Sequence, residues 1–336
     1  MKVWEVQSKE GLDALTLTER PESQPMAGQV LLKMRAASLN YRDLLTVKGA
    51  YNSKQKLPLI PLSDGVGEVV AVGEGVTRVK IGDRVAGIFM QKWVAGEFSA
   101  EKSNSALGGA IDGVLAEYVM LHEDGVVHVP EHLSDEEAAA LPCAAVTAWH
   151  GLITEGNLKA GDTILVQGTG GVSIFALQFA KLVGARVIAT SSSDEKLERA
   201  RQLGAFEGIN YKTTPNWDEQ VWKLTEGVGV DHVVEVGGAG TLNKSLRAVK
   251  VGGRVSLIGV LSGLGGDIST VSILHKNIRV QGIYVGSREM FEAMNRAIAL
   301  HKTRPIIDRV FPFEEAREAL AYLESGAHFG KICIRF

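Results

Sequence analysis

A glycine-rich segment in the middle of the chain has the residue types and spacing needed to hold a pyrophosphate. It follows the short apolar run Ile164–Val166 and precedes an expected helix over Val172–Val183. Glycines let the backbone turn tightly and let an anion approach without meeting a Cβ. The amides that begin the helix would point at that anion. The expected anion-binding residues are Gly168, Thr169, Gly170, Gly171 and Val172.

The surrounding elements favour a dinucleotide site over an ordinary strand-to-helix turn, which is the alternative. A second expected strand, Arg186–Thr190, closes a strand–helix–strand unit. The third glycine of the G-x-G-x-x-G pattern is replaced by Ser173. That position packs the helix against the strand, and serine is small enough to be tolerated there.

The residues after the second strand indicate which dinucleotide is bound. An NAD site places an acidic residue here to bind the ribose 2′-hydroxyl, whereas this chain has Ser191, Ser192 and Ser193, followed by Lys196. Hydroxyl groups and an ammonium group can bind a 2′-phosphate. The pattern therefore predicts NADPH as the cofactor. The alternative is a serine-rich helix cap followed by a solvated lysine.

The flanking sequence predicts two kinds of architecture. Up to about Val129, short expected strands alternate with glycine turns, which is typical of a compact β-barrel-like domain. These strands are Gln29–Ala37, Gly65–Val72, Asp83–Phe89 and Leu115–Leu121. From Thr163 onward, strands alternate with helices, which predicts a doubly wound sheet of six parallel strands. Its later strands are expected at Gly208–Asn210, His232–Val236, Arg254–Gly259 and Ile278–Tyr284, with helices at Trp217–Glu226 and Thr241–Val249.

The C-terminal segment has no core of its own. It contains expected helices at Glu289–Leu300 and Phe313–Leu323 and a strand at Lys331–Phe336. We expect it to return to the first domain, which is then discontinuous. The predicted domains are residues 1–143 with 287–336, and residues 144–286.

Composition excludes several classes of protein. The chain has 336 residues, 45% of them hydrophobic and 22% charged, with a formal net charge of −3. No basic run indicates a nucleic-acid or membrane partner. The longest nearly apolar stretch, Ala138–Trp149, is too short to span a bilayer. Cys143 and Cys333 form no C-x-x-C pair. We therefore expect a cytoplasmic globular enzyme that acts on a small molecule.

Several motifs together resemble the medium-chain dehydrogenase/reductase superfamily over nearly the whole chain. They are residues 37–51, 57–76, 81–87 and 141–152, the GTGGVS turn, and residues 329–336. The resemblance implies a catalytic domain like GroES joined to a Rossmann domain. Within the superfamily the chain looks like the zinc-independent quinone oxidoreductase and enoyl reductase branch.

The resemblance also places the zinc-ligand positions of the alcohol dehydrogenases in this sequence. They hold Asn40, Ser63 and Cys143, and the adjacent acidic position holds Asp64. Asparagine and serine are poor zinc ligands. The region of the second, structural zinc, around Gln91–Gly113, contains no cysteine. Both metals are therefore predicted to be absent, with Cys143 a small buried side chain.

Without a metal, hydrogen bonds must stabilise charge on the substrate oxygen. Tyr51 aligns with the tyrosine acid of enoyl reductases, although it could be a plain loop aromatic. Asn40 would donate to the nicotinamide amide or the substrate carbonyl, or else form a turn. Asp64 could relay a proton or occupy a turn. Asp43 would make structural hydrogen bonds at a helix start, and Arg42 would bind an anionic substrate group or face water.

Further cofactor contacts follow from the resemblance. Lys196 and Tyr211 match the lysine–tyrosine pair that holds the 2′-phosphate in NADPH-dependent relatives. Thr147 aligns with a threonine at the nicotinamide face, and Lys331 with a basic residue near the pyrophosphate. Three further positions follow expected strands, at the edge where open α/β sheets bind ligands. They are Gly237, Gly259 and Val260. The alternative is that each belongs to a simple turn that ends its strand.

The resulting hypothesis is an NADPH-dependent, zinc-independent reductase of quinones or α,β-unsaturated carbonyls. The alternatives are an alcohol dehydrogenase or ketone reductase of the same superfamily, and a non-enzymatic NADPH-binding protein. We also expect a homodimer, because Ile278–Tyr284 would form an exposed sheet edge and edges are covered or paired.

Overall fold

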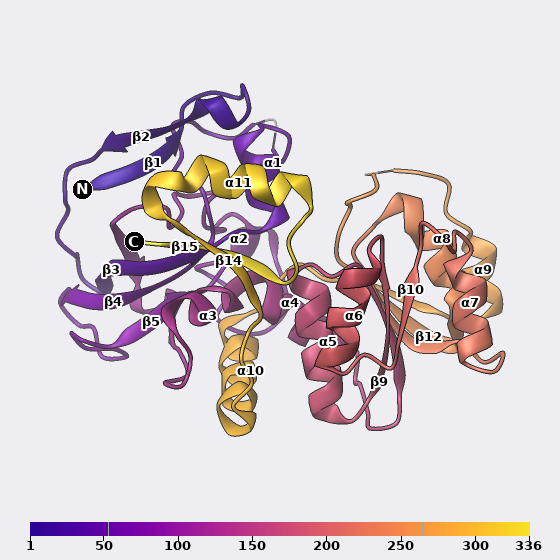
Figure 1. Ribbon diagram of the computed structural model, residues 1–336. Coiled ribbons are helices and arrows are strands. Elements are labelled where there is room, and N and C mark those ends of the chain that lie inside the picture. The colour runs from indigo at the N-terminus through magenta and orange to yellow at the C-terminus, as the bar shows by residue number, and fades with distance from the viewer. Residues whose placement is uncertain (53, 264) are drawn as a thin grey trace. The chain divides into compact units, whose positions relative to one another are not determined.

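The computed structural model describes residues 1–52, 54–263 and 265–336. These residues form two compact units, Met1–Val146 with Gly286–Phe336, and Thr147–Val285. The first unit is thus made from both ends of the chain. In Figure 1 the yellow C-terminal segment lies among the indigo and violet N-terminal strands.

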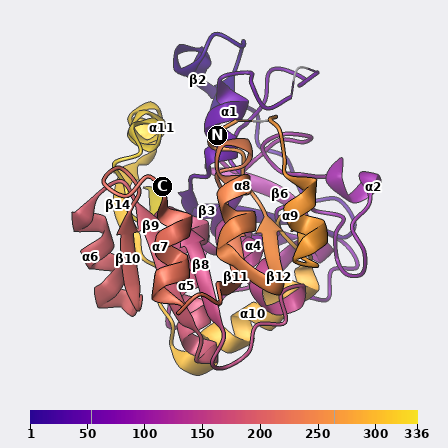
Figure 2. The same ribbon diagram turned by 90° about the vertical axis from the view of Figure 1, so that its right-hand side faces the viewer.

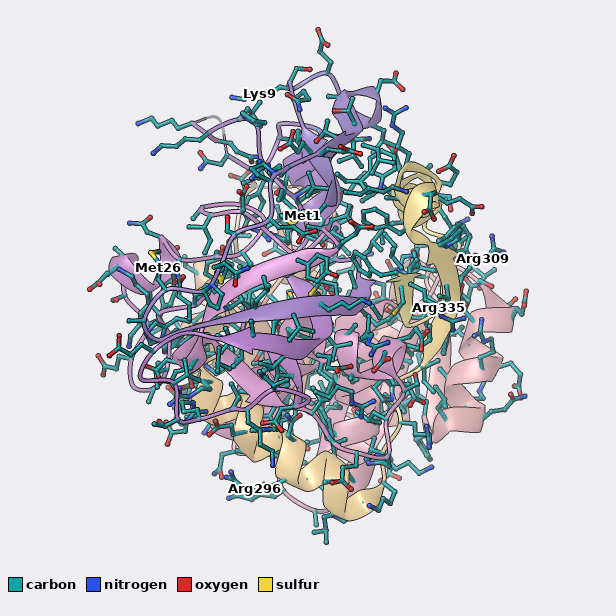
Figure 3. The ribbon with its side chains drawn as sticks, turned by 90° about the vertical axis from the view of Figure 1, so that its left-hand side faces the viewer. Met1, Lys9, Met26, Arg296, Arg309 and Arg335 are labelled. Carbon is teal, nitrogen blue, oxygen red and sulfur yellow. The ribbon has the colours of Figure 1, made fainter. Side chains whose placement is uncertain are left out.

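The first unit is built on a seven-stranded sheet of order β14-β15-β3-β4-β5-β7, with β6 also paired to β3. The strands are β3 (Gln29–Ser38), β4 (Asp64–Val72), β5 (Arg84–Gly87), β6 (Tyr118–His122), β7 (Val126–His128), β14 (Ile307–Pro312) and β15 (Lys331–Arg335). The last strand, β15, pairs antiparallel with β3. Figure 3 shows Arg309 and Arg335 on β14 and β15, and Arg296 on helix α10.

A second, smaller sheet pairs β1 (Lys2–Val6) with β2 (Leu15–Glu19). Strands β5 and β6 are shorter than the sequence predicted, because only part of each expected run pairs with a neighbour. The helices of this unit include α1 (Tyr41–Val47), α2 (Ala100–Ser103), α3 (Asp135–Ala139) and α10 (Arg288–His301). A π-helical turn, Leu141–Ala145, follows α3.

Helix α11 (Ala316–Ser325) shows why the C-terminal segment joins the first unit. Its buried residues, Ala316, Ala319, Leu320 and Leu323, recur at helical spacing and form one apolar stripe. That stripe packs into the same hydrophobic cluster as Leu15, Leu32 and Ile332. The C-terminal segment therefore buries its apolar face in the core of the first unit.

The second unit holds a six-stranded sheet of order β10-β9-β8-β11-β12-β13, in which all neighbours are parallel. The strands are β8 (Thr163–Gln167), β9 (Arg186–Ser191), β10 (Glu207–Asn210), β11 (Val230–Glu235), β12 (Val249–Leu257) and β13 (Arg279–Gly282). Figure 2 shows most of them side by side between helices. This confirms the predicted doubly wound sheet, whose order reverses between β8 and β11.

The helices of this unit are α5 (Gly171–Val183), α6 (Asp194–Leu203), α7 (Trp217–Leu224), α8 (Ala239–Ala248) and α9 (Thr270–His275). Helix α9 was not predicted, since none of its residues is buried. Strand β12 begins at Val249, earlier than expected, because its first residue pairs with Val230 before a bulge. Helix α4 (Val146–Trp149) continues into a second π-helical turn, His150–Thr154.

No helix in the described part of the chain is both long enough and apolar enough to cross a lipid bilayer.

Candidate active site

The predicted cofactor residues of the second unit gather at the carboxyl edge of its sheet. Gly168 follows β8, Ser191 ends β9, Tyr211 follows β10, Gly237 lies just beyond β11 and Gly259 just beyond β12. The carboxyl ends of parallel strands meet at one edge, and ligands bind there beside the point where the strand order reverses. The five positions therefore lie along the edge at which a dinucleotide is expected.

The turn after β8 has the form of an anion cradle. Gly168 has a φ of +71°, and a Cβ added to it would meet no atom within 4 Å. Gly170 is the N-cap of α5 and no side chain caps that helix. The first backbone amides of α5 are therefore open to a bound anion. Thr169 is buried, whereas Gly171 and Val172 are half-buried.

Ser173 fits where the motif usually has glycine, because its side chain turns back to the strand. The hydroxyl donates to the carbonyl oxygen of Gln167 at 2.6 Å. The side chain is 2% exposed and leaves the amide end of the helix uncovered. Serine thus links α5 to β8 at the point where glycine would serve close packing.

One of the three serines, Ser193, caps helix α6, which is the capping role that the alternative interpretation expected. Ser193 Oγ accepts a hydrogen bond from the Lys196 amide at 3.3 Å, and Ser191 Oγ accepts one from the Ser193 amide at 3.3 Å. A hydroxyl that accepts one bond can still donate its proton. Ser192 and Ser193 are half-buried. The capping geometry is therefore compatible with a phosphate at the same place.

The acidic residue that follows the serines is turned aside. Asp194 accepts a hydrogen bond from Asn210 Nδ2 at 2.8 Å on the β10 side. Tyr211 is 42% exposed and Lys196 is half-buried. Ser191 thus ends β9, Lys196 lies in the first turn of α6 and Tyr211 follows β10, while the Asp194 carboxylate is engaged by Asn210.

The sequence did not reveal a buried polar network across the reversal point of the sheet. The Glu235 carboxylate is fully buried at the end of β11. It accepts from Gln167 Nε2 at 2.7 Å, from Thr241 Oγ1 at 2.6 Å, and from the Ser245 hydroxyl. The amides of Gly237 and Gly238 also donate to it, at 2.8 and 2.9 Å. This network holds the turn after β11 against β8.

Packing alone accounts for the two glycines that follow β11 and β12. A Cβ on Gly237 would lie 2.2 Å from Thr241 Oγ1, and one on Gly259 would lie 2.3 Å from the Val236 oxygen. Val260 is 42% exposed, and Thr147, in α4, is buried. The cofactor contacts of these four residues stay predictions.

In the first unit, the structure brings Asn40, Asp64 and Lys331 together. Lys331 is 3% exposed, and its ammonium donates to Asn40 Oδ1 at 2.6 Å and to the Leu39 oxygen at 2.5 Å. Its charge also lowers the pKa of Asp64 against the larger effect of burial. The ammonium thus contacts the start of α1 and acts on the carboxylate that begins β4.

The amide of Asn40 is left with one group unused. Its Nδ2 is buried and has no hydrogen-bond partner among the residues that the structure describes. Nδ2 still helps to lower the pKa of Asp64, although it makes no hydrogen bond of normal length and angle to that carboxylate. The Asn40 backbone amide donates to Asp43 Oδ2 at 2.8 Å, so Asp43 has the structural role expected of it.

Asp64 is fully buried and already engaged at both oxygens. Oδ1 accepts from Ser63 Oγ at 2.7 Å, and Oδ2 accepts from the Cys143 amide at 3.0 Å. Burial raises the pKa of Asp64, and the charge of Lys331 and these hydrogen bonds offset part of that rise. The carboxylate thus ties β4 to the π-helical turn that holds Cys143.

The chemistry of these side chains does not suit a catalytic zinc. Catalytic zinc needs three protein ligands chosen from thiolate, imidazole and carboxylate. Here the Asn40 oxygen faces an ammonium group, and Ser63 donates to Asp64. Burial and the nearby carboxylates raise the pKa of the Cys143 thiol. Across the described residues, no three His, Cys, Asp or Glu side chains gather in a way that could hold a metal.

Arg42 points inward, so the expectation that it might face water is wrong. It is 9% exposed, and Nη1 donates to the Leu107 oxygen at 2.5 Å. Its guanidinium lies over the rings of Phe89 and Tyr51, at 4.8 and 5.1 Å from their centroids. Tyr51 itself is 37% exposed. Arg42 therefore fixes the ring of Tyr51 by a cation–π contact.

Arg42 also links Tyr51 to the start of α1. Its Nη1 lies 3.5 Å from Asp43 Oδ1. Burial raises the pKa of Asp43 to about 6, against the opposing charge of Arg42. Tyr51 is thus connected, through Arg42 and Asp43, to the helix start that carries Asn40.

Comparison with known proteins agrees with both units. Residues 26–131 match the alcohol dehydrogenase GroES-like domain, and residues 171–299 match the zinc-binding dehydrogenase family. A zinc-type alcohol dehydrogenase-like protein of Schizosaccharomyces pombe is 46% identical to this chain. The alignment covers 97% of this chain and 96% of the Schizosaccharomyces pombe protein. An acryloyl-coenzyme A reductase of Metallosphaera sedula is 31% identical over 94% and 95%.

A crystal structure of a candidate alcohol dehydrogenase from Sinorhizobium meliloti has a TM-score of 0.94 and 43% identity. The superposition covers 100% of this chain and 98% of the Sinorhizobium meliloti chain. Such dehydrogenases bind a nicotinamide dinucleotide, and solved relatives include an NAD-dependent enzyme and an NADPH complex. The chain therefore belongs to the medium-chain dehydrogenase/reductase superfamily and is an oxidoreductase.

Proposed function

We propose that this protein is an NADPH-dependent, metal-independent reductase of quinones or α,β-unsaturated carbonyls. The observation that carries the proposal is the buried group of Asn40, Asp64 and Lys331, in which the Lys331 ammonium donates to the Asn40 oxygen and so takes up that acceptor. An acryloyl-coenzyme A reductase among the relatives supports a conjugated carbonyl as the acceptor.

The second unit would hold the cofactor by its phosphates. The open amides of α5 suit the pyrophosphate, and Ser192, Ser193, Lys196 and Tyr211 suit a 2′-phosphate. When bound, NADPH supplies a hydride to the acceptor. The Asp194 carboxylate, which follows the serines, is held by Asn210 and is less available to a ribose hydroxyl.

The first unit would stabilise the charge that develops on the acceptor oxygen. Hydride addition to a conjugated carbonyl moves negative charge to that oxygen, and hydrogen-bond donors stabilise such charge best in a buried site. Asn40 Nδ2 is a buried donor with no partner among the described residues. Tyr51 carries a phenol that can donate a proton. Asp64 would orient its neighbours, because both its oxygens are already engaged.

Reduction of simple ketones is the weaker alternative. Such carbonyls need strong polarisation, which zinc supplies in alcohol dehydrogenases. The donor groups of Asn40, Ser63, Asp64 and Cys143 do not suit that metal. A non-enzymatic NADPH-binding protein would keep the β8 turn but would not need the buried donor of Asn40.

We also propose a homodimer formed through β13. All four residues of β13 are exposed at the edge of the sheet. Val280 is the exposed apolar residue of the strand, and Val271 and Leu274 of the preceding helix α9 are also exposed. An exposed strand edge is a liability unless another strand pairs with it.

Loss of absorbance at the nicotinamide band, measured with quinones, enones and simple ketones, tests the proposed function. We expect turnover with at least one conjugated acceptor and little with saturated ketones. Turnover of saturated ketones alone would support the alcohol dehydrogenase alternative. Tight NADPH binding without turnover of any acceptor would support the non-enzymatic alternative.

A further inference from the structure

We propose that Lys331 is a positioning residue that fixes the orientation of the Asn40 amide and thereby presents its Nδ2 to a ligand oxygen. The inference rests on the proposed function and extends it, because it assigns Lys331 to Asn40 and not to the pyrophosphate. It concerns contacts within the first unit only.

The chemistry of the two side chains allows one orientation. An ammonium group only donates, whereas the end of an asparagine side chain has one accepting oxygen and one donating nitrogen. Lys331 Nζ lies 2.6 Å from Asn40 Oδ1, so the nitrogen must point away from Lys331. The ammonium is itself held by the Leu39 oxygen at 2.5 Å. Neither group can turn without losing a buried hydrogen bond.

The outcome of this arrangement is a buried donor that acts on the pKa of Asp64 but makes no hydrogen bond of ordinary length and angle. Asn40 is 9% exposed and its Nδ2 is buried, with no partner in the described ranges of the chain. A buried donor that makes no hydrogen bond lowers stability. A ligand oxygen placed beside Nδ2 would supply the missing acceptor and recover that stability. The ligand oxygen would be a carbonyl, either the acceptor substrate's or the nicotinamide carboxamide's.

The position of Lys331 does not favour direct contact with a phosphate. Its side chain is 3% exposed at the start of β15, and its ammonium already donates to two oxygens. The second unit separately offers the open amides of α5 for the pyrophosphate. Lys331 is therefore better placed to act through Asn40.

The test compares N40A, K331M and the double variant. Two quantities are measured for each variant: kcat, and the affinity for NADPH relative to the affinity for 2′-phospho-ADP-ribose. This fragment has the pyrophosphate but no nicotinamide. We expect at least a 10-fold loss of kcat in each single variant, with no further loss in the double variant. The control K33M replaces an exposed lysine of β3 and should leave kcat unchanged. Additive losses would overturn the proposal.

The fragment separates the two assignments of Lys331. We expect K331M to bind 2′-phospho-ADP-ribose as tightly as the original protein. A 10-fold weaker fragment affinity with unchanged kcat would assign Lys331 to the pyrophosphate and overturn the proposal. If the original protein turns over no acceptor, the proposed function fails. In that case the inference is tested by binding alone, through the extra affinity, which is the ratio of the affinity for NADPH to that for 2′-phospho-ADP-ribose. We then expect N40A and K331M to reduce this ratio equally and non-additively. An unchanged ratio would overturn the inference.

A second variant covers the case in which K331M does not fold. N40D keeps an oxygen for the Lys331 ammonium and removes the Nδ2 donor. We expect N40D to fold and to lose kcat, or the extra NADPH affinity, as fully as N40A does. If N40D keeps both, Nδ2 serves no ligand and the proposal is wrong.

Discussion

Gln167 and Glu235 join the two central strands of the Rossmann sheet at the point where the strand order reverses. Gln167 Nε2 donates to Glu235 Oε2 at 2.7 Å, and Gln167 Oε1 accepts from the amides of Val236 and Gly237 at 3.2 Å. With the other donors to Glu235, this pair sets the shape of the turn after β11. The pair thus couples the end of β8, where the glycine turn begins, to the neighbouring loop.

Replacing Glu235 with glutamine should therefore destabilise the second unit. In either orientation the new NH2 group would face a donor, the Gly237 and Gly238 amides on one side or Gln167 Nε2 on the other. We expect E235Q to lower the free energy of unfolding by about 2–4 kcal/mol, as for other disrupted buried charge networks. Denaturant unfolding measures this. T241V removes one donor and should cost about 1 kcal/mol; equal losses in both variants would contradict this role for the carboxylate.

Lys196 should discriminate between the two dinucleotides. K196M removes a charge near the proposed 2′-phosphate position, so we expect NADPH to bind about 10-fold more weakly and NADH to bind equally well. Titration calorimetry with both cofactors measures this change. K181M, on α5, is the matched control, since Lys181 Nζ donates to the Leu203 oxygen at the opposite end of α6. Tighter binding of NADH than NADPH by the original protein would refute the cofactor assignment.

Tyr51 should act as the proton donor. Y51F keeps the aromatic ring against Arg42 and removes only the phenolic hydroxyl. We therefore expect kcat for a conjugated acceptor to fall about 100-fold, as for loss of a general acid. Y41F is the control, because Tyr41 is similarly exposed at the start of α1. Stopped-flow measurement of NADPH oxidation gives both rates. Equal rates for Y51F and the original protein would make Tyr51 a structural loop residue only.

His232 should make the second unit less stable in acid. Burial lowers the pKa of His232 to about 4. The unfolded chain takes up this proton near its ordinary pKa of about 6.5, and the folded chain does so only near the lower value. The contribution of neutral His232 is thus complete above about pH 6.5 and is lost as pH falls towards 4; it amounts to about 3 kcal/mol.

H232N should reduce the slope of unfolding free energy against pH between 6.5 and 4. The asparagine removes the titrating group; its shorter side chain loses the hydrogen bond that His232 Nε2 makes with Ser256 at 2.8 Å, which lowers stability at every pH without adding to the slope. Urea unfolding at a series of pH values measures the slope. H301N, at the exposed end of α10, should leave it unchanged. The same slope in H232N and the original protein would show that other groups determine the acid sensitivity.

The sequence predicted the fold well because periodicity reports burial directly. The alternation of apolar strands and amphipathic helices from Thr163 onward predicted six parallel strands, and the structure confirms a parallel sheet of six. The bounds were less accurate where tertiary pairing decides them, as at β12, whose first residue pairs with Val230. Helix α9 has no buried stripe and so carries little periodic signal.

The candidate site was harder to predict because its contacts join distant parts of the chain. The glycine turn is local, so its residues could be identified together. The contact of Lys331 with Asn40 depends on β15 pairing with β3. No local pattern marks Glu235 as the acceptor of five donors, because Gln167 and Ser245 reach it from other elements. Arg42 was expected either to face water or to bind an anion, and its inward path became visible only with the rings around it.

Metal dependence tests the central claim most directly. The protein is dialysed against a strong chelator, its zinc content is measured, and NADPH oxidation is followed with a conjugated acceptor that the untreated protein reduces. The buried group of Asn40, Asp64 and Lys331 predicts full activity at less than about 0.1 zinc per chain, because its donors do not form a catalytic zinc site. Activity that disappears with the metal and returns in proportion to one added zinc per chain would contradict the account.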